Sequence, residues 1–145
     1  MITQEYLNNI SYKVIGAAIE VHRHLGPGLL ESVYQTCLAD ELRSRGLKVT
    51  TQVKVDILYK GKNLGNHLVL DIMVEDLIIL ELKAVEYMNP LYEAQLLSYL
   101  KLTGKPKGLL INFNSTNISK DLVSLVTEKY RRLGIEERPN MDFRK

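Results

Sequence analysis

The sequence predicts one α/β domain in which helices flank a mixed β-sheet. Its 145 residues, 46% of them hydrophobic, are enough for a single domain with a substantial core. Apolar residues first recur at helical spacing, and short apolar runs typical of strands follow. The predicted order of elements is α-α-β-β-β-α-β-α.

Two helices are predicted at the start of the chain. Apolar side chains recur every three or four residues from about residue 3 to residue 24. Gly26-Pro27-Gly28 must end this helix. A second apolar stripe runs from about residue 29 to residue 45, and Gly46 stops it.

Three strands are expected next. Alternating valines from Val49 begin the first one, and residues 60–63, Lys-Gly-Lys-Asn, predict a hairpin turn after it. Glu75-Asp76 predicts a second tight turn between two nearly apolar runs, residues 67–74 and 77–84.

The last third of the chain continues the α/β pattern. Asn89 as cap and Pro90 at the first helical position predict a helix that ends near Gly104. Residues 108–113 predict a short strand, and residues 119–133 a final helix. We expect residues 1–134 to form the domain and residues 135–145 a charged tail.

Three charged residues interrupt the two most apolar strands. Because strand side chains alternate between faces, Asp71 is expected on the face opposite Leu70 and Ile72. Glu81 and Lys83 are expected to share one face of the next strand. Charges inside a sheet are costly unless they are paired or bind a metal. These residues therefore predict a site, with a buried ion pair of purely structural value as the alternative.

The charge distribution favours a site that holds a cation and accepts a polyanion. Residues 43–62 carry six basic side chains and one acidic one, whereas residues 71–93 carry six acidic side chains and one basic one. The net charge of +2 does not by itself indicate nucleic acid. For Glu75, Asp76 and Glu86, a solvated surface is the simpler interpretation.

Asp71, followed on the next strand by Glu81-Leu82-Lys83, resembles the core motif of the PD-(D/E)xK nuclease superfamily. Residues 28–34 read G-x-x-E-x-x-Y, which is similar to the signature of the small prokaryotic GxxExxY proteins assigned to that superfamily. Residues 93–100 resemble the same family's next segment and the Q-x-x-x-Y helix of RecB-type nucleases. The resemblance spans about residues 15–114 and implies a restriction-endonuclease-like core.

The resemblance implies hydrolysis of phosphodiester bonds assisted by Mg²⁺ or Mn²⁺. Asp71, Glu81 and the backbone carbonyl of Leu82 would be the metal ligands. Lys83 would orient the attacking water and offset the developing charge. The sequence departs from the family pattern at Leu70, which stands where the motif has proline.

Three more residues are candidates on the same grounds. Glu31 would be an auxiliary acid that enters from the second helix, although a first-turn glutamate is also favoured by the helix dipole. Gln95 and Tyr99 lie one helical turn apart and would bind a phosphate or stack on a base. Their alternative is a buried amide and a core tyrosine. We expect Tyr34 to fix Glu31 by packing rather than to act in catalysis.

Composition limits the remaining function classes. The single cysteine excludes a disulfide framework and any four-thiolate metal site within one chain. No signal peptide or membrane-spanning run is recognisable, so we expect a cytoplasmic protein. The first hypothesis is a metal-dependent nuclease acting on DNA. The others are a non-catalytic module that binds nucleic acid or a protein partner, and a structural homo-oligomer.

Overall fold

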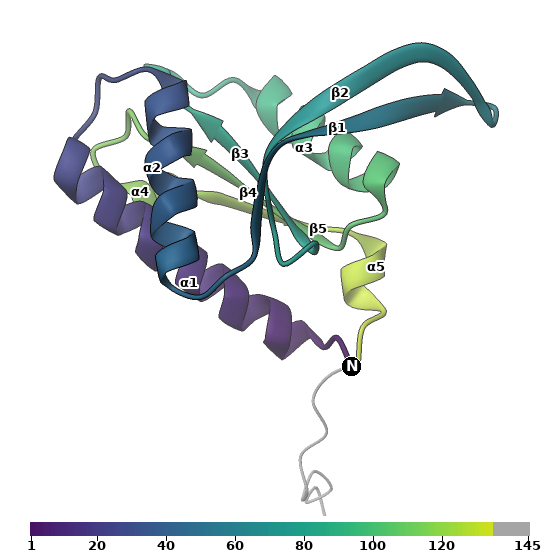
Figure 1. Cartoon of the computed structure of the whole chain (residues 1–145), viewed down its shortest axis with the longest axis horizontal. Coiled ribbons are helices and arrows are strands. Elements are labelled where there is room, and N and C mark those ends of the chain that lie inside the picture. The colour runs from purple at the N-terminus through teal and green to yellow at the C-terminus, as the bar shows by residue number, and fades with distance from the viewer. Residues whose placement is uncertain (135–145) are drawn as a thin grey trace, which may run out of the picture.

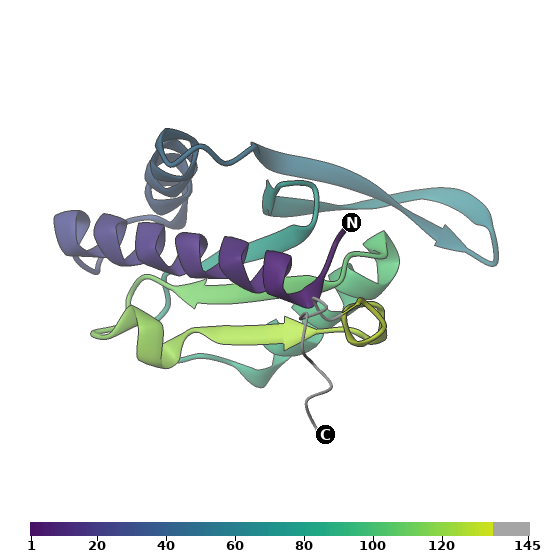
Figure 2. The same ribbon diagram turned by 90° about the horizontal axis from the view of Figure 1, so that it is seen from below.

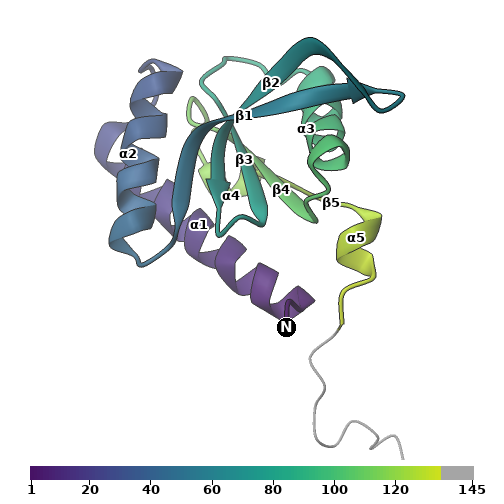
Figure 3. The same ribbon diagram turned by 45° about the vertical axis from the view of Figure 1, so that its right-hand side comes forward.

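The computed structural model describes residues 1–134, so the expected tail at 135–145 lies outside the described residues. A five-stranded mixed sheet forms its centre, with α1 and α2 against one face and α3 against the other (Figure 1, Figure 3). The helices are α1 (Gln4–Leu25), α2 (Glu31–Ser44), α3 (Pro90–Thr103), α4 (Ile118–Asp121) and α5 (Glu128–Arg131). The strands are β1 (Val49–Tyr59), β2 (Lys62–Val74), β3 (Ile78–Lys83), β4 (Lys107–Asn112) and β5 (Val123–Val126).

Helices α1 and α3 begin at residues whose side chains cap them. The Thr3 hydroxyl accepts a hydrogen bond from the Tyr6 amide at the start of α1. The Asn89 side chain accepts one from the Leu91 amide at the start of α3, and Gly104 ends α3 in the left-handed conformation with φ 71°. None of the described helices is long and apolar enough to cross a membrane.

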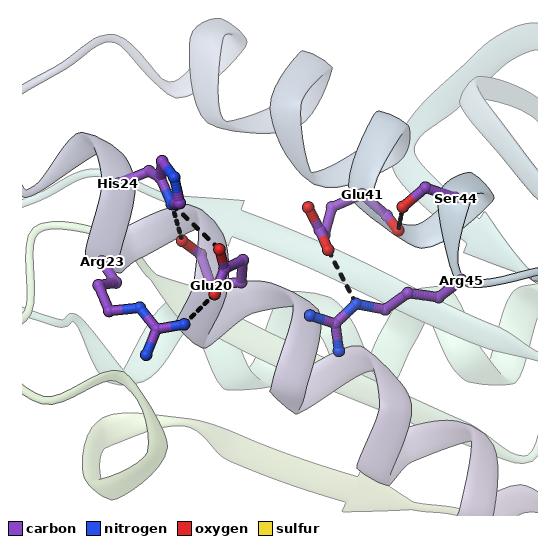
Figure 4. A network of polar contacts seen from close by, with 6 residues as sticks. All are labelled: Glu20, Arg23, His24, Glu41, Ser44 and Arg45. Atoms are coloured by element: carbon purple, nitrogen blue, oxygen red, sulfur yellow. Dashed lines mark hydrogen bonds and ion pairs between the residues drawn. The ribbon is translucent and has the colours of Figure 1, made fainter.

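The outer surfaces of α1 and α2 carry ion pairs within each helix. Glu20 pairs with Arg23 and His24 on α1, and Glu41 pairs with Arg45 on α2 (Figure 4). These partners lie three or four residues apart, which places them on one helix face. Each pair joins residues close in sequence, but the Arg45 guanidinium also lies beside Gly16 of α1.

The sheet follows the strand order β1-β2-β3-β4-β5. Two tight turns, each with two successive residues at positive φ, join the first three strands as antiparallel neighbours. The connection through α3 then places β4 parallel to β3. Figure 2 shows α1 running across the sheet while the β1–β2 hairpin extends well beyond it.

The predicted final helix is wrong. Residues 118–131 form the single turns α4 and α5 with strand β5 between them, antiparallel to β4. Leu122, Leu125 and Val126 fit a helical spacing, but Val123 and Leu125 also alternate as strand residues do. Pairing with the edge of β4 decides between the two, because it satisfies backbone groups that would otherwise be unpaired.

Each face of the sheet has its own hydrophobic core. Leu80 and Leu82 lie in the core under α1 and α2, whereas Ile79 lies under α3, as alternation along β3 predicts. Leu70 was expected to share a face with Ile72, and this is wrong. Leu70 packs under α3 and Ile72 under α1 and α2.

A kink between β1 and β2 explains the changed face of Leu70. Gln52 has φ 51° in the middle of β1, a conformation uncommon for a non-glycine residue. Thr51 pairs with Ile72 and Val53 with Leu70, so the kink lies opposite Asp71. The side-chain Nε2 of Gln52 also donates a hydrogen bond to the side-chain Oε1 of Gln35 on α2 at 2.7 Å. The extra local twist turns the outer half of the hairpin relative to the sheet.

Candidate active site

The strands β2 and β3 separate at Asp71 and Glu81. Their backbone pairing ends with Ile72 opposite Leu80. At the next position the Asp71 carboxylate accepts a hydrogen bond from the Leu82 amide at 2.8 Å. The Glu81 carboxylate lies 3.4 Å from the Asp71 amide, which donates to it. The two carboxylates therefore fill the gap where the ladder stops.

Burial raises the pKa of both carboxyl groups, and the charge of Asp71 raises that of Glu81 further. Burial, followed by the charge of Asp71, raises the pKa of Glu81 from 4.5 to about 8. Burial also raises the pKa of Asp71, although the Leu82 amide and the Lys83 ammonium oppose the rise. Without an added cation the pair therefore retains a proton near neutral pH.

Lys83 stands beside the carboxylates without an ion pair to either. Its Nζ lies 4.4 Å from the centroid of the Tyr92 ring on α3. Among the described residues, neither Asp71 nor Glu81 has a cationic nitrogen within 4.0 Å. The Lys83 charge nevertheless lowers the pKa of both acids. The structure therefore does not contain the buried Glu81–Lys83 pair that was the alternative interpretation of this motif.

Glu31 begins α2 at the rim of the same cluster. Its side chain is largely exposed, yet partial burial and then the charge of Asp71 raise its pKa. Electrostatic coupling to Asp71 and Lys83 is not expected of a glutamate that serves only the helix dipole. Glu31 therefore faces the carboxylates from the adjoining helix.

Tyr34 holds the loop that leads into α2. Its ring is fully buried and stacks on Phe113 with 4.6 Å between centroids. Its hydroxyl donates to the Gly26 carbonyl at 2.5 Å and accepts from the Leu29 amide at 3.1 Å. Both hydrogen bonds of the Tyr34 hydroxyl thus go to the loop between α1 and α2, which fits the predicted packing role beside Glu31.

Helix α3 presents a polar stripe to the cluster. Tyr99 is partly buried, and burial followed by the charges of Glu81 and Asp71 raises its pKa. Gln95, one turn earlier, is exposed, so the alternative of a buried amide is wrong. Tyr92 continues this stripe because it lies three residues before Gln95 and seven before Tyr99. The sequence analysis missed Tyr92, although this spacing was a usable signal.

Asn112 is a second residue that the sequence analysis missed. It is buried at the end of β4, where it pairs with Lys83 in the parallel register. Its side chain accepts a hydrogen bond from the Val85 amide at 3.1 Å and donates one to the Val85 carbonyl at 2.9 Å. It therefore fixes the path of the chain just after Lys83. A polar residue ending an apolar run was the only sequence signal.

The donor set fits a hard divalent cation that keeps several of its waters. Within the described part of the chain, no three His, Cys, Asp or Glu side chains gather to hold a metal ion. A cation here would therefore rely on Asp71 and Glu81, with backbone and water oxygens completing its shell. A cation between the two carboxylates would oppose the effect of burial and of the Asp71 charge, which together raise the pKa of Glu81.

Other acidic residues near the motif serve the fold. The Glu75 carboxylate accepts a hydrogen bond from the Lys48 amide at 2.6 Å, which joins the β2–β3 turn to the chain before β1. Asp76 pairs with Lys105 at 3.4 Å and is largely exposed. Both lie at the opposite end of β3 from Glu81, and the solvated-surface interpretation fits Asp76 but not the half-buried Glu75.

The family model of the PD-(D/E)XK nuclease superfamily matches residues 8–125, which is more than half of the chain. The chain belongs to this superfamily. Nucleases of the superfamily generally use divalent metal ions, and the mixed sheet flanked by helices agrees with their restriction-endonuclease-like fold. No curated protein matches the chain in a sequence search. No solved structure matches it either.

Proposed function

We propose that the protein is a metal-dependent nuclease that hydrolyses phosphodiester bonds of DNA. The observation that carries the proposal is the meeting of Asp71 and Glu81 where β2 and β3 separate, with Lys83 next to them and unpaired to either. Membership of the nuclease superfamily supports the same conclusion. Within the superfamily, we propose that the chain is one of the GxxExxY proteins, which the G-x-x-E-x-x-Y segment at residues 28–34 supports.

Asp71, Glu81 and the Leu82 carbonyl would hold one Mg²⁺ or Mn²⁺. When bound, the ion polarises a phosphate oxygen and makes a water more acidic. Asp71 is already fixed by the Leu82 amide, so this ligand needs little reorganisation to bind. Lys83 would donate a hydrogen bond to the attacking water or to a phosphate oxygen, where its charge offsets the negative charge that develops.

The surrounding residues have supporting roles in this proposal. Glu31, at the exposed rim, would accept a hydrogen bond from a water in the site. Gln95 and Tyr99 would contact the phosphate or a base from α3. Tyr92 would guide Lys83 by holding its ammonium over the ring.

DNA is the preferred substrate because basic side chains gather between residues 43 and 62, a segment that passes the site where Thr51 and Val53 pair with the neighbours of Asp71. The domain is proposed to comprise residues 1–134. A cytoplasmic location and a homodimer or protein partner remain predictions from the sequence.

Cleavage assays test the proposal. Single- and double-stranded DNA and RNA would be incubated with the parent protein in Mg²⁺ or Mn²⁺, beside Asp71→Asn and Lys83→Ala. Asp76→Asn and Lys101→Ala change the same residue types at exposed positions outside the site and serve as controls.

We expect the parent and both controls to cut DNA and the two site variants not to cut it. Equal cleavage by all five proteins would show a contaminant and contradict the proposal. DNA binding by the parent with no cleavage in either metal would favour the non-catalytic module.

A further inference from the structure

The hairpin formed by β1 and β2 extends far beyond the sheet from a point beside the active site. Figure 1 shows this arm, defined as residues 54–69, leaving the sheet near the start of α2 and passing α3. At its base, Val55 and Leu68 pack against the core under α3. From residue 58 to residue 67 every side chain is exposed. The outer arm is therefore presented to solvent.

A β-bulge interrupts the pairing of β1 and β2 in the outer arm. Asp56 pairs with His67 and Leu58 with Asn63, so three residues of β2, at 64–66, lie opposite one residue of β1. The side-chain Oδ1 of Asn63 accepts a hydrogen bond from the Gly65 backbone amide at 2.9 Å, and Gly65 has φ 95°. Bulges of this kind redirect side chains and are usually functional.

The bulge displays apolar side chains at the outer end of the arm. Leu64 is 62% exposed and Leu58 is 57% exposed. Exposed aliphatic residues on a projecting strand pair promote aggregation unless they have a partner. The exposure of Leu58 and Leu64 therefore indicates that a binding partner covers them.

The charge of the arm indicates which kind of partner would cover these leucines. Lys54, Lys60 and Lys62 accompany the leucines, and Lys60 lies 5.5 Å from the centroid of the Tyr59 ring, which is 61% exposed. The one acidic residue of the arm, Asp56, accepts a hydrogen bond from the Asn63 side chain. A second copy of the arm would bring the same lysines together, and like charges disfavour that pairing. A polyanion with apolar stacked bases matches both the lysines and the leucines.

We propose that the arm grips a DNA duplex next to the active site, with Lys60 and Lys62 on phosphates and Leu64 inserted between neighbouring bases. Proteins that bend DNA use apolar wedges of this type. The inference rests on the proposed function because the same duplex would reach Asp71. Leu64 lies seven residue steps before Asp71 along β2. At about 3.3 Å per residue this is at most about 23 Å, or about seven base pairs of 3.4 Å.

Binding to a 30-base-pair duplex, measured by fluorescence anisotropy over a salt series in EDTA, tests the phosphate contacts without cleavage. The double variant Lys60→Ala/Lys62→Ala should bind about tenfold more weakly or worse. The slope of log K against log salt should fall by about two. Lys13→Ala on α1, on the far face of the sheet, should change neither quantity. An unchanged affinity and slope in the double variant would overturn the proposal.

The wedge is tested with 2-aminopurine, whose fluorescence rises when a base is unstacked. Probes placed within seven base pairs of the cut, or of the footprint centre if nothing is cut, should brighten with the parent and stay dark with Leu64→Ser. Ile19→Ser on α1, also exposed, should behave like the parent. No brightening by the parent would refute the wedge.

Sedimentation of the parent and Leu64→Ser tests whether a second copy of the chain, rather than DNA, binds the arm. Loss of self-association in the variant, with DNA binding unchanged, would make the arm an interface between copies and overturn the proposal. DNA binding through the arm with no cleavage would remove the nuclease function but keep this inference. Absence of any DNA binding by the parent would remove both.

Discussion

The carboxylate of Asp71 accepts the hydrogen bond of the Leu82 amide at 2.8 Å, at the position where a backbone carbonyl of β2 would otherwise pair with β3. One side chain thus ends the ladder and brings Asp71 against the neighbouring strand. The Glu81 carboxyl group lies in the same gap, where burial and then the charge of Asp71 raise its pKa to about 8. The end of the ladder and the proposed cation site are consequently one structural feature.

The first prediction concerns the stability of the metal-free protein. The unfolded chain loses the Glu81 proton near pH 4.5, whereas the folded protein keeps it up to about pH 8. Stability from this group is complete below pH 4.5 and falls as the pH rises to about 8. Glu81→Gln should flatten this decline and stabilise the protein at pH 8.5 by a few kcal/mol, since one pKa unit corresponds to about 1.4 kcal/mol.

Urea unfolding in EDTA between pH 5 and 9 measures this effect. Glu86→Gln, an exposed change of the same type, should keep the decline of the parent. An identical pH profile for Glu81→Gln and the parent would contradict the raised pKa.

Metal binding should release a proton. A cation needs ionised carboxylates, and Glu81 retains its proton at pH 7. Calorimetric titration with Mg²⁺ at pH 7, in buffers of different ionisation enthalpy, should report release of about one proton, and this number should fall toward zero by pH 9. Constant release over that range would mean that another group binds the metal. Asp71→Asn should abolish the binding heat.

Lys83→Ala should separate catalysis from stability. Lys83 has no ion pair with the carboxylates, so its removal loses the contact with the Tyr92 ring and about 0.5–1 kcal/mol of stability. Cleavage should fall by about a hundredfold or more, because the developing charge loses the cationic side chain beside the proposed metal site. Urea unfolding and single-turnover cleavage measure the two effects. A large loss of stability with a small loss of the cleavage rate would show that Lys83 has a structural role and not a catalytic one.

Tyr34→Phe should act through the loop before Glu31. It leaves the half-buried Gly26 carbonyl without its 2.5 Å partner, which destabilises the protein by about 0.5–1.5 kcal/mol. Cleavage should also fall, and Tyr34→Phe should cost less in a Glu31→Gln background than alone. Fully additive losses would show that Tyr34 and Glu31 act independently.

Asn112→Ala should disturb the position of Lys83. Both backbone groups of Val85 lose their partner, so a loss of about 2–4 kcal/mol is expected. In the folded variant kcat should fall with little change in KM, because Asn112 is not expected to touch the substrate. Asn112→Asp keeps the acceptor and should recover part of kcat. Loss of stability with kcat intact would limit Asn112 to the fold.

Local signals in the sequence were sufficient for much of the fold. The Thr3 region, Asn89-Pro90 and the two tight turns mark boundaries through capping and backbone geometry, which depend on near neighbours. The pairing of Asp71 with the Glu81 strand followed from the short turn between them. The face of Leu70 did not follow, because the kink at Gln52 interrupts the alternation.

Features that need distant segments escaped prediction. Strand β5 forms because the edge of β4 is available, which its own short sequence does not disclose. Asn112 matters only because β4 lies beside the end of β3, where its side chain reaches Val85. Tyr92 was within reach through its spacing from Gln95, but only the structure places the Lys83 ammonium over its ring.

The most direct test is a crystal grown with Mn²⁺ and examined by anomalous scattering. A single strong peak is predicted between the carboxylates of Asp71 and Glu81, about 2.2 Å from an oxygen of each and near the Leu82 carbonyl. The peak should vanish in Asp71→Asn while the fold is retained. Absence of a peak there at millimolar Mn²⁺, or a peak held by other residues, would contradict the claim that the separation of β2 and β3 builds a cation site.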